Sequence, residues 1–187
     1  MSEFEIYRPK PIDGFAWANP VGDADREQLN RISGQPITDW IPPSVEFVLS
    51  DDRPPTAAQI PDVPWRGQQT LVFRERASEL VRPILEPWGQ FLELKNKDTS
   101  ESLWMFNVCT VIDALDEGAS EVAYFRDGVR IMMVKRWQLK RSALPDTAVF
   151  RIPKTSVLLL SNGVVDRLQA LPITGVGFEL LWRASSS

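Results

Sequence analysis

The sequence predicts an α+β fold: a single domain over residues 1–187, with a mostly antiparallel sheet, a few short helices and a proline-rich N-terminal part wrapped around the sheet. Two observations predict it. Ten of the fifteen prolines lie before position 65, whereas from Gln69 onward apolar runs of four to eight residues alternate with turn signals. With 187 residues, 43% of them hydrophobic, the chain is long enough to bury a core without disulfides.

The N-terminal part, residues 1–68, is predicted to be largely extended. Its prolines exclude long uninterrupted helices and central strands, because proline lacks the backbone N–H that both use. Within it, ADREQLNRI (Ala24–Ile32) predicts a short helix and VEFVL (Val45–Leu49) a short strand. Apolar residues along the segment should hold it against the sheet, namely Phe15, Trp17, Ile32, Ile37, Trp40, Phe47 and Trp65.

Residues 69–182 are predicted to form the core of the sheet. The turn RDG (residues 126–128) joins two of its runs, and a short Asp-Gly link between β-rich runs indicates a hairpin. The expected strands are Thr70–Phe73, Phe91–Leu94, Ser102–Val108, Val122–Phe125, Val129–Leu139, Ala148–Ile152, Ser156–Leu160 and Val176–Trp182.

Two segments of this core resemble each other, TLVFRERASELVRPILEPWGQFLEL and SVLLLSNGVVDRLQALPITGVGFELL. Each predicts a strand, an amphipathic helix, a turn with proline and glycine, and a second strand. In the first helix Pro83 should cap or kink the last turn. The offset between the segments changes along their length, so they share a supersecondary pattern and not a sequence repeat. Both units could belong to one sheet.

The absent residue types limit the chemistry. With no histidine, the chain lacks the commonest general base and metal ligand and every triad that uses imidazole. Cys109 is the only cysteine, which excludes an internal disulfide and favours a small buried side chain over a nucleophile. There is no phosphate-binding glycine loop, CxxC pair, secretory signal or run of eighteen apolar residues. We expect no cofactor, no membrane segment and a cytoplasmic location.

The stretch FNVCTVIDALD (Phe106–Asp116) ends in two carboxylates, Asp113 and Asp116. If Val111–Asp116 were helical, both would lie on one face, and with Glu117 and Glu121 they could bind a divalent cation. The alternative is an acidic turn after a core strand, with Asp113 capping its own backbone. The turn is favoured, because calcium loops need more oxygen ligands at closer spacing than DALDEG provides.

Charge is unevenly distributed along the chain. Residues 101–122 contain five acids and no bases, whereas residues 126–154 contain eight bases against two acids, which predicts a bipolar protein. The basic segment, with Tyr124, Phe125 and Trp137, makes nucleic acid one candidate partner. A net charge of −4 opposes that, and alternate residues of a strand project to opposite faces. The acidic segment favours a basic protein partner.

Seven tryptophans are many for this length, and tryptophan often dominates the energy of protein interfaces. Most should lie in the core. Trp65, Trp88 and Trp104 are the candidate interface anchors, beside the charge candidates Asp113, Asp116, Glu117 and Glu121.

Three blocks carry a family resemblance: NVCTVIDALD (Asn107–Asp116), LPDTAVFRI (Leu144–Ile152) and the finish from VVDRL to GVGFEL (Val164–Leu180). Together with the upstream LVFRERASELVRPIL they resemble bacterial polymorphic-toxin immunity proteins of immunity protein family 11. The resemblance covers about residues 69–182. It implies a cytoplasmic protein that binds and neutralises a cognate toxin, such as the effector domain of a Rhs-type protein, and it transfers no catalytic residue.

Three functions therefore compete. The first is a non-enzymatic immunity protein that inhibits a toxin by stoichiometric binding. The second is a nucleic-acid-binding regulator that uses residues 126–154, and the third is a carboxylate-dependent hydrolase acting through Asp113 and Asp116. The sequence favours the first, and it leaves open whether the protein is a monomer or a homodimer.

Overall fold

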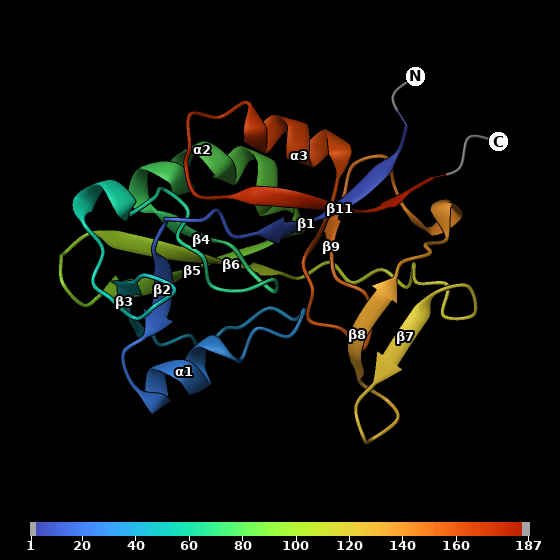
Figure 1. Cartoon of the computed structure of the whole chain (residues 1–187), viewed down its shortest axis with the longest axis horizontal. Helices are drawn as coiled ribbons and strands as arrows, with labels where there is room; N and C mark the ends of the chain where they lie inside the picture. Colours follow the sequence, from blue (N-terminus) through green and yellow to red (C-terminus); the bar gives the residue numbers. More distant parts are fainter. Residues whose placement is uncertain (1–2, 185–187) are drawn as a thin grey trace.

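The computed structural model describes residues 3–184, which form an α+β fold with mostly antiparallel strand pairing (Figure 1). The strands are β1 (Glu5–Lys10), β2 (Trp17–Pro20), β3 (Ser44–Val48), β4 (Val72–Arg74), β5 (Gly89–Asn96), β6 (Ser102–Val108), β7 (Glu121–Tyr124), β8 (Ile131–Arg136), β9 (Val149–Phe150), β10 (Leu159–Ser161) and β11 (Gly177–Arg183). The α-helices are α1 (Asp23–Leu29), α2 (Glu75–Leu85) and α3 (Asn162–Gln169), and short 3₁₀ helices occur at Ala57–Gln59, Glu86–Trp88 and Arg141–Ala143.

The strands of residues 3–184 form three sheets. The five-stranded sheet has the order β2-β3-β5-β6-β4, and the four-stranded sheet has the order β11-β1-β10-β9. Strands β7 and β8 form a separate antiparallel pair. Pairing is antiparallel throughout, except between β3 and β5.

The two similar segments form equivalent units in different sheets, so the alternative that they share one sheet is wrong. In the first unit, α2 connects β4 to β5, and β6 lies between these strands. In the second, α3 connects β10 to β11, and β1 lies between them. Because the inserted strand is antiparallel to both neighbours, the two outer strands of each unit run parallel.

Helices α2 and α3 cover one side of both sheets and share a core with them (Figure 1). The buried residues of α2 recur at Ala77, Val81, Ile84 and Leu85, a spacing that forms one apolar stripe. Helix α3 contributes Val164, Val165 and Leu168 to the same cluster. Helix α2 ends two residues beyond Pro83 and continues as a 3₁₀ turn, as expected for a proline near a helix end.

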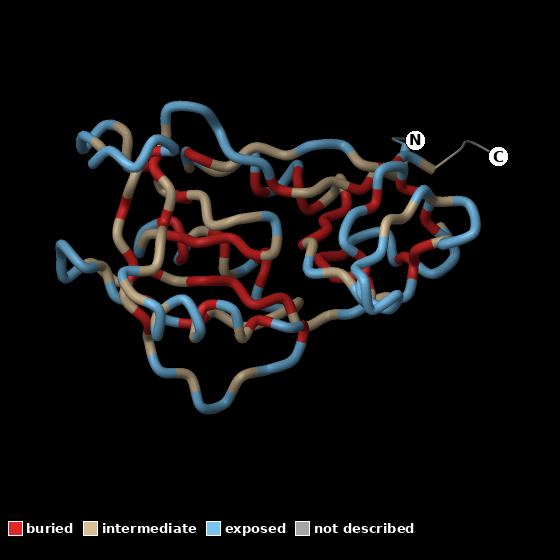
Figure 2. The backbone as a smooth tube through the Cα atoms, turned by 60° about the horizontal axis from the view of Figure 1, so that its bottom comes forward, coloured by how far each residue is buried: buried red, intermediate tan, exposed pale blue. Residues whose placement is uncertain are grey.

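Both sheets are also buried on their second face. In β10, Leu160 points into the core shared with the helices, whereas Leu159 points into a second core beneath β7 and β8. In β6, Phe106 faces the helices and Met105 faces a third core that includes Leu29 of α1. Figure 2 shows buried backbone running through both halves of the molecule, with exposed loops around them.

The N-terminal part is extended and wrapped, as predicted, but it also supplies two inner strands. Strand β1 lies between β10 and β11, and β3 lies between β2 and β5, so the exclusion of central strands is wrong. Pro9 is tolerated in β1 because the ladder to β10 ends at Tyr7, which leaves one side of Pro9 without a strand partner. None of the helices in residues 3–184 is both long enough and apolar enough to cross a bilayer.

Candidate functional site

The acidic segment that follows β6 is a turn and not a helix. Val111 bridges Arg151 and Leu115 bridges Leu139, which holds residues 111–115 extended. Asp116 caps the turn, because its Oδ1 accepts the N–H of Ala119 at 3.1 Å. The turn interpretation is therefore confirmed, but Asp116 and not Asp113 is the capping residue. Since residues 111–115 are extended, the two carboxylates do not share a helix face.

Each remaining carboxylate of the segment lies near a lysine. Asp113 lies 4.0 Å from Lys140, and Glu121 lies 3.4 Å from Lys135. Glu117 accepts hydrogen bonds from the Tyr124 hydroxyl at 2.5 Å and from Lys154 at 2.9 Å. The Tyr124 bond and then the Lys154 bond lower the pKa of Glu117, and the bond to Glu117 raises the pKa of Tyr124. Residues 3–184 contain no cluster of three or more Cys, Asp or Glu side chains arranged to hold a metal ion.

These pairs remove the predicted separation of charge. Five of the eight bases in residues 126–154 form ion pairs, and one, Arg151, is buried. Burial lowers the pKa of Arg151 to about 10, and its guanidinium donates a hydrogen bond to the Gln69 carbonyl at 2.8 Å. Of these eight bases, Arg126, Arg136 and the buried Arg151 have no acidic partner among the described residues. The basic segment therefore does not form the continuous patch that binding a nucleic acid requires.

The hairpin β7–β8 projects away from the two larger sheets (Figure 1). Its turn is held by Asp127, whose carboxylate accepts the N–H groups of Val129 at 2.9 Å and Arg130 at 3.0 Å. The Arg130 side chain also donates to Asp127 at 2.6 Å and lies 5.1 Å above the Phe125 ring. These bonds, the Arg130 side chain first, lower the pKa of Asp127 to about 2. Gly128 adopts φ +67°, as tight turns between strands favour.

Two irregularities in β8 decide which side chains of the hairpin face solvent. Glu121 pairs with Arg136 and Val122 with Val134, so Lys135 is an extra residue in β8. Ala123 pairs with Met133 and Tyr124 with Ile131, which makes Met132 a second extra residue. Bulges of this kind redirect the side chains beside them.

Because of these bulges, every third side chain of this segment is buried, whereas a regular strand buries every second one. Ile131, Val134 and Trp137 are buried in the second core, at 7%, 9% and 7% exposure. Between them, Met132 and Met133 are exposed. Strict alternation would have placed Met133 on the same face as Ile131.

The hairpin consequently carries a concentrated apolar surface. Of the ten large apolar residues exposed in residues 3–184, five lie in the hairpin, within residues 124–133. They are Tyr124 (38%), Phe125 (45%), Val129 (59%), Met132 (55%) and Met133 (47%), and we call them the hairpin face. Tyr124, Phe125 and Met132 line one hollow of this surface, and exposed apolar residues grouped in this way are typical of binding surfaces. In the sequence, the only sign of this surface was the pair of adjacent methionines in a predicted strand. Strand alternation would have assigned one of the two to the buried face.

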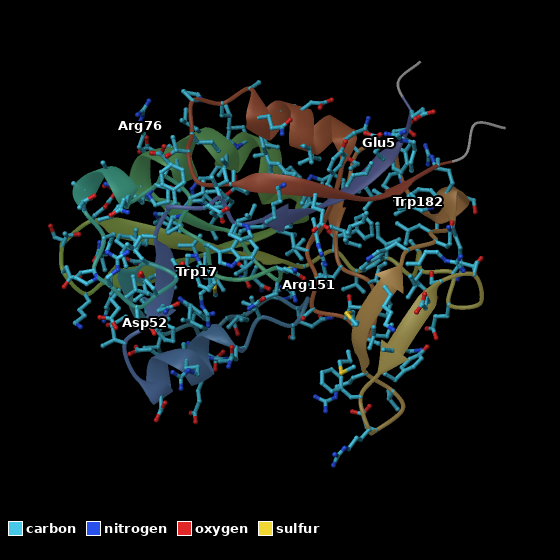
Figure 3. All side chains as sticks on the ribbon, in the orientation of Figure 1. Glu5, Trp17, Asp52, Arg76, Arg151 and Trp182 are labelled. Carbon is cyan, nitrogen blue, oxygen red and sulfur yellow. The ribbon has the colours of Figure 1, made fainter. Side chains whose placement is uncertain are left out.

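The three candidate tryptophans do not join this surface. Trp88 is partly buried between the first two cores, and Trp65 bridges Trp17 beside β2. Trp104 lies on β6, where the guanidinium carbon of Arg82 is 4.6 Å from the centre of the Trp104 ring. Figure 3 shows Trp17 well separated from the hairpin. The structure therefore brings Glu117 and Glu121 next to the hairpin face but leaves these tryptophans on other elements.

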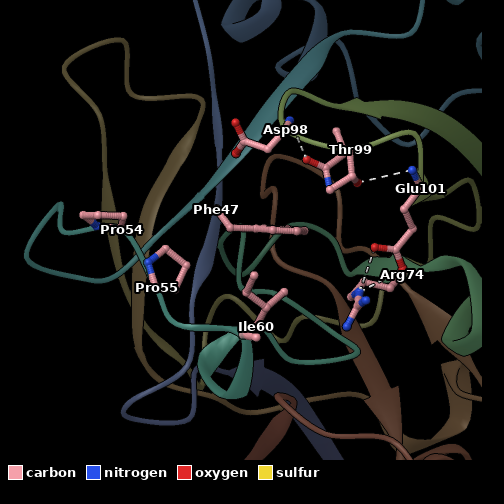
Figure 4. A pocket seen from close by; sticks show the side chains of 10 residues that line it. Phe47, Pro54, Pro55, Ile60, Arg74, Asp98, Thr99 and Glu101 are labelled. Atoms are coloured by element: carbon pink, nitrogen blue, oxygen red, sulfur yellow. Dashed lines mark hydrogen bonds and ion pairs between the residues drawn. The ribbon is translucent and has the colours of Figure 1, made fainter.

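A cavity of about 270 Å³ lies beside the five-stranded sheet, and Phe47 and Ile60 are among the residues that line it (Figure 4). At its rim Arg74 donates to both carboxylate oxygens of Glu101, at 2.9 and 3.1 Å. Arg74 and Glu101 thus pair with each other, whereas Asp98, which also lines the cavity, forms no ion pair within residues 3–184. Cys109 offers no reactive group either, because burial raises the pKa of its thiol.

Comparison with protein-family models finds a match to part of this chain. The model of the Immunity protein family (Imm11) matches residues 91–181. This segment is similar to the Imm11 family. The match confirms the resemblance seen in the sequence, although the upstream part, residues 69–90, lies outside it. The Imm11 segment runs from β5 into β11 and contains the acidic turn, the hairpin face and α3. Among curated proteins, none matches the chain.

Proposed function

We propose that this chain is an immunity protein that binds a cognate antibacterial toxin in the cytoplasm and neutralises it by stoichiometric protein–protein contact. The Imm11 match over residues 91–181 carries the proposal. The chemistry of the chain is consistent with it, because a stoichiometric inhibitor needs a complementary surface and no reactive group. The partner we propose is the effector domain of a secreted polymorphic or Rhs-type toxin encoded beside this chain.

The acidic and aromatic candidates stay predictions within this proposal. Glu117 and Glu121 border the hairpin face, and Asp113 and Asp116 lie in the preceding turn, so the acidic group could contribute to the rim of one contact surface. Trp65, Trp88 and Trp104 lie apart from it and would have to act at other contacts. Stable protein–protein interfaces of standard size bury about 800 Å² and about 20–30 residues on each partner, more residues than the five of the hairpin face.

Co-expression with the toxin from the neighbouring gene tests the proposal. Cells that express the toxin alone should stop growing, whereas cells that also express this chain should grow. The two proteins should co-purify as one complex of fixed composition. Toxicity that persists, with no complex on gel filtration, would refute the proposal.

A titration then separates binding from catalysis. When the purified chain is added to a fixed amount of toxin, residual toxin activity should fall linearly and reach its minimum at a fixed molar ratio near one. Complete inactivation at a small fraction of that ratio would show turnover and would contradict a non-enzymatic mechanism.

A further inference from the structure

The side chains of the hairpin face are exposed although the strand that carries most of the hairpin's buried residues, β8, is well packed. Ile131, Val134 and Trp137 fix β8 to the second core, and the bulges at Met132 and Lys135 turn the remaining side chains outward. Figure 3 shows side chains extending from the free end of the hairpin into open space. Exposing apolar surface costs solubility, so a surface held outward by this many contacts indicates a partner that covers it.

The composition of the hairpin face suits a protein partner. Aromatic side chains supply large contact areas, and methionine adapts to irregular apolar surfaces because its side chain is unbranched and polarizable. Two of the five residues of the face are aromatic and two are methionine.

The charge around the hairpin face specifies the partner further. Residues 121–136 contain four bases and two acids, a balance of +2. Both acids are paired, Glu121 with Lys135 and Asp127 with Arg130. In the described chain Arg126 has no acidic partner, and Arg136 donates only to the Ala119 carbonyl, at 3.2 Å. The free charge beside the face is therefore positive.

We propose that the hairpin face is the surface through which this chain binds its toxin, and that the toxin presents an apolar depression with carboxylates at its margin. The inference rests on the proposed function and adds the place and the chemistry of the contact. It reverses the charge expected from the sequence. Of the four acids that the sequence assigned to a basic partner, Asp113, Glu117 and Glu121 are already paired with lysines of this chain, and Asp116 caps the acidic turn.

A second copy of this chain fits the hairpin face less well. In a two-fold symmetric dimer the same patch meets itself, which would bring Arg126 and Arg136 of one copy near those of the other. Like charges brought together in this way oppose association. A toxin with carboxylates at that position pairs with both arginines.

The experiment compares two matched sets of variants by the Kd for the purified toxin, measured calorimetrically. The first pair is Met132→Ser with Met133→Ser against Val21→Ser with Ile41→Ser, which removes exposed apolar surface away from the hairpin. The second pair is Arg126→Glu against Arg76→Glu; Arg76 is exposed on α2, far from the hairpin in Figure 3. Thermal melts confirm that each variant folds.

We expect the double methionine variant to raise Kd at least about tenfold. A tenfold rise corresponds to about 1.4 kcal/mol, and truncating a hot-spot residue costs about 2 kcal/mol or more. Arg126→Glu should raise Kd and reduce its dependence on salt. Both controls should change Kd less than about threefold. If the wild type binds the toxin and the methionine variant binds equally well, this inference is overturned and the proposed function stands.

Three other outcomes would overturn the assigned chemistry, the assigned partner or the proposed function. Tighter binding by Arg126→Glu would show a basic margin on the toxin and overturn the assigned chemistry. A wild-type dimer that Met132→Ser with Met133→Ser converts to a monomer would assign the face to a second copy. Failure of the wild type to bind the toxin would remove the proposed function, and this inference with it.

Discussion

The three-residue repeat of β8 predicts unequal costs for two neighbouring truncations. Val134 is 9% exposed and packs in the second core, whereas Met133, the preceding residue, is 47% exposed on the hairpin face. Strict alternation from Ile131 would reverse these environments. Truncating each residue to alanine therefore tests the bulges that define the hairpin face.

The structure sets the magnitudes. Val134→Ala removes two buried methyl groups and leaves a small cavity, which should lower the free energy of unfolding by about 2 kcal/mol. For a chain of 187 residues this corresponds to a fall in Tm of roughly 4–8 °C. Met133→Ala removes a larger side chain, but one already half in water, and should cost less than about 1 kcal/mol.

Urea denaturation followed by tryptophan fluorescence measures both costs. Lys135→Ala, at the exposed bulge of the same strand, serves as the control for placing alanine in β8. A Met133→Ala variant that loses as much stability as Val134→Ala would show that β8 alternates normally, and the argument for the hairpin face would fail.

Three further predictions concern the hairpin and the N-terminal wrap. Tyr124→Phe removes the stronger of the two bonds that lower the pKa of Glu117, so that pKa should rise, and an unchanged NMR titration of the carboxyl would contradict the contact. Because the pKa of Asp127 is lowered to about 2 from 3.8, its stabilisation of the turn should be complete above pH 4 and lost as pH falls toward 2. The protection factor of the Val129 amide, its intrinsic exchange rate at each pH divided by the observed rate, should then fall over that range and stay constant above it. Gly175→Ala should lower the free energy of unfolding by more than about 1 kcal/mol. Gly175 has a φ of +94°, and an added Cβ would lie 2.4 Å from Pro61 of the N-terminal part. A thermal unfolding curve unchanged from the wild type would rule out this close approach.

Much of the fold followed from local patterns. The spacing of Leu80, Val81 and Ile84 predicted an amphipathic helix, and two of these three, Val81 and Ile84, are buried in α2. The apolar run Ser102–Val108 predicted β6 with its observed bounds. Such patterns succeed because helix and strand periodicity depend on neighbours along the chain. The absence of histidine likewise excluded whole classes of catalysis without any structure.

The failures involve partners distant in sequence. Pro9 argued against an inner strand, but β1 is inserted between β10 and β11, whose residues lie more than 150 positions away. Burial in the four-stranded sheet outweighs the one missing backbone donor, since the neighbouring ladder has already ended there. The acidic segment likewise appeared free until Lys140 and Lys154 were found beside it.

The sequence alone determined the α+β class, the helices and most strands, the Imm11 relationship and the lack of imidazole chemistry, because each depends on residue identity or local spacing. Only the tertiary structure decided which charges are paired and which apolar side chains stay outside. A one-residue bulge reverses the face of every side chain beyond it, and no local pattern in IMMVKRW states where the bulge lies. The hairpin face, which we propose as the toxin contact, depends on these bulges and on the packing of Ile131 and Val134 in the second core.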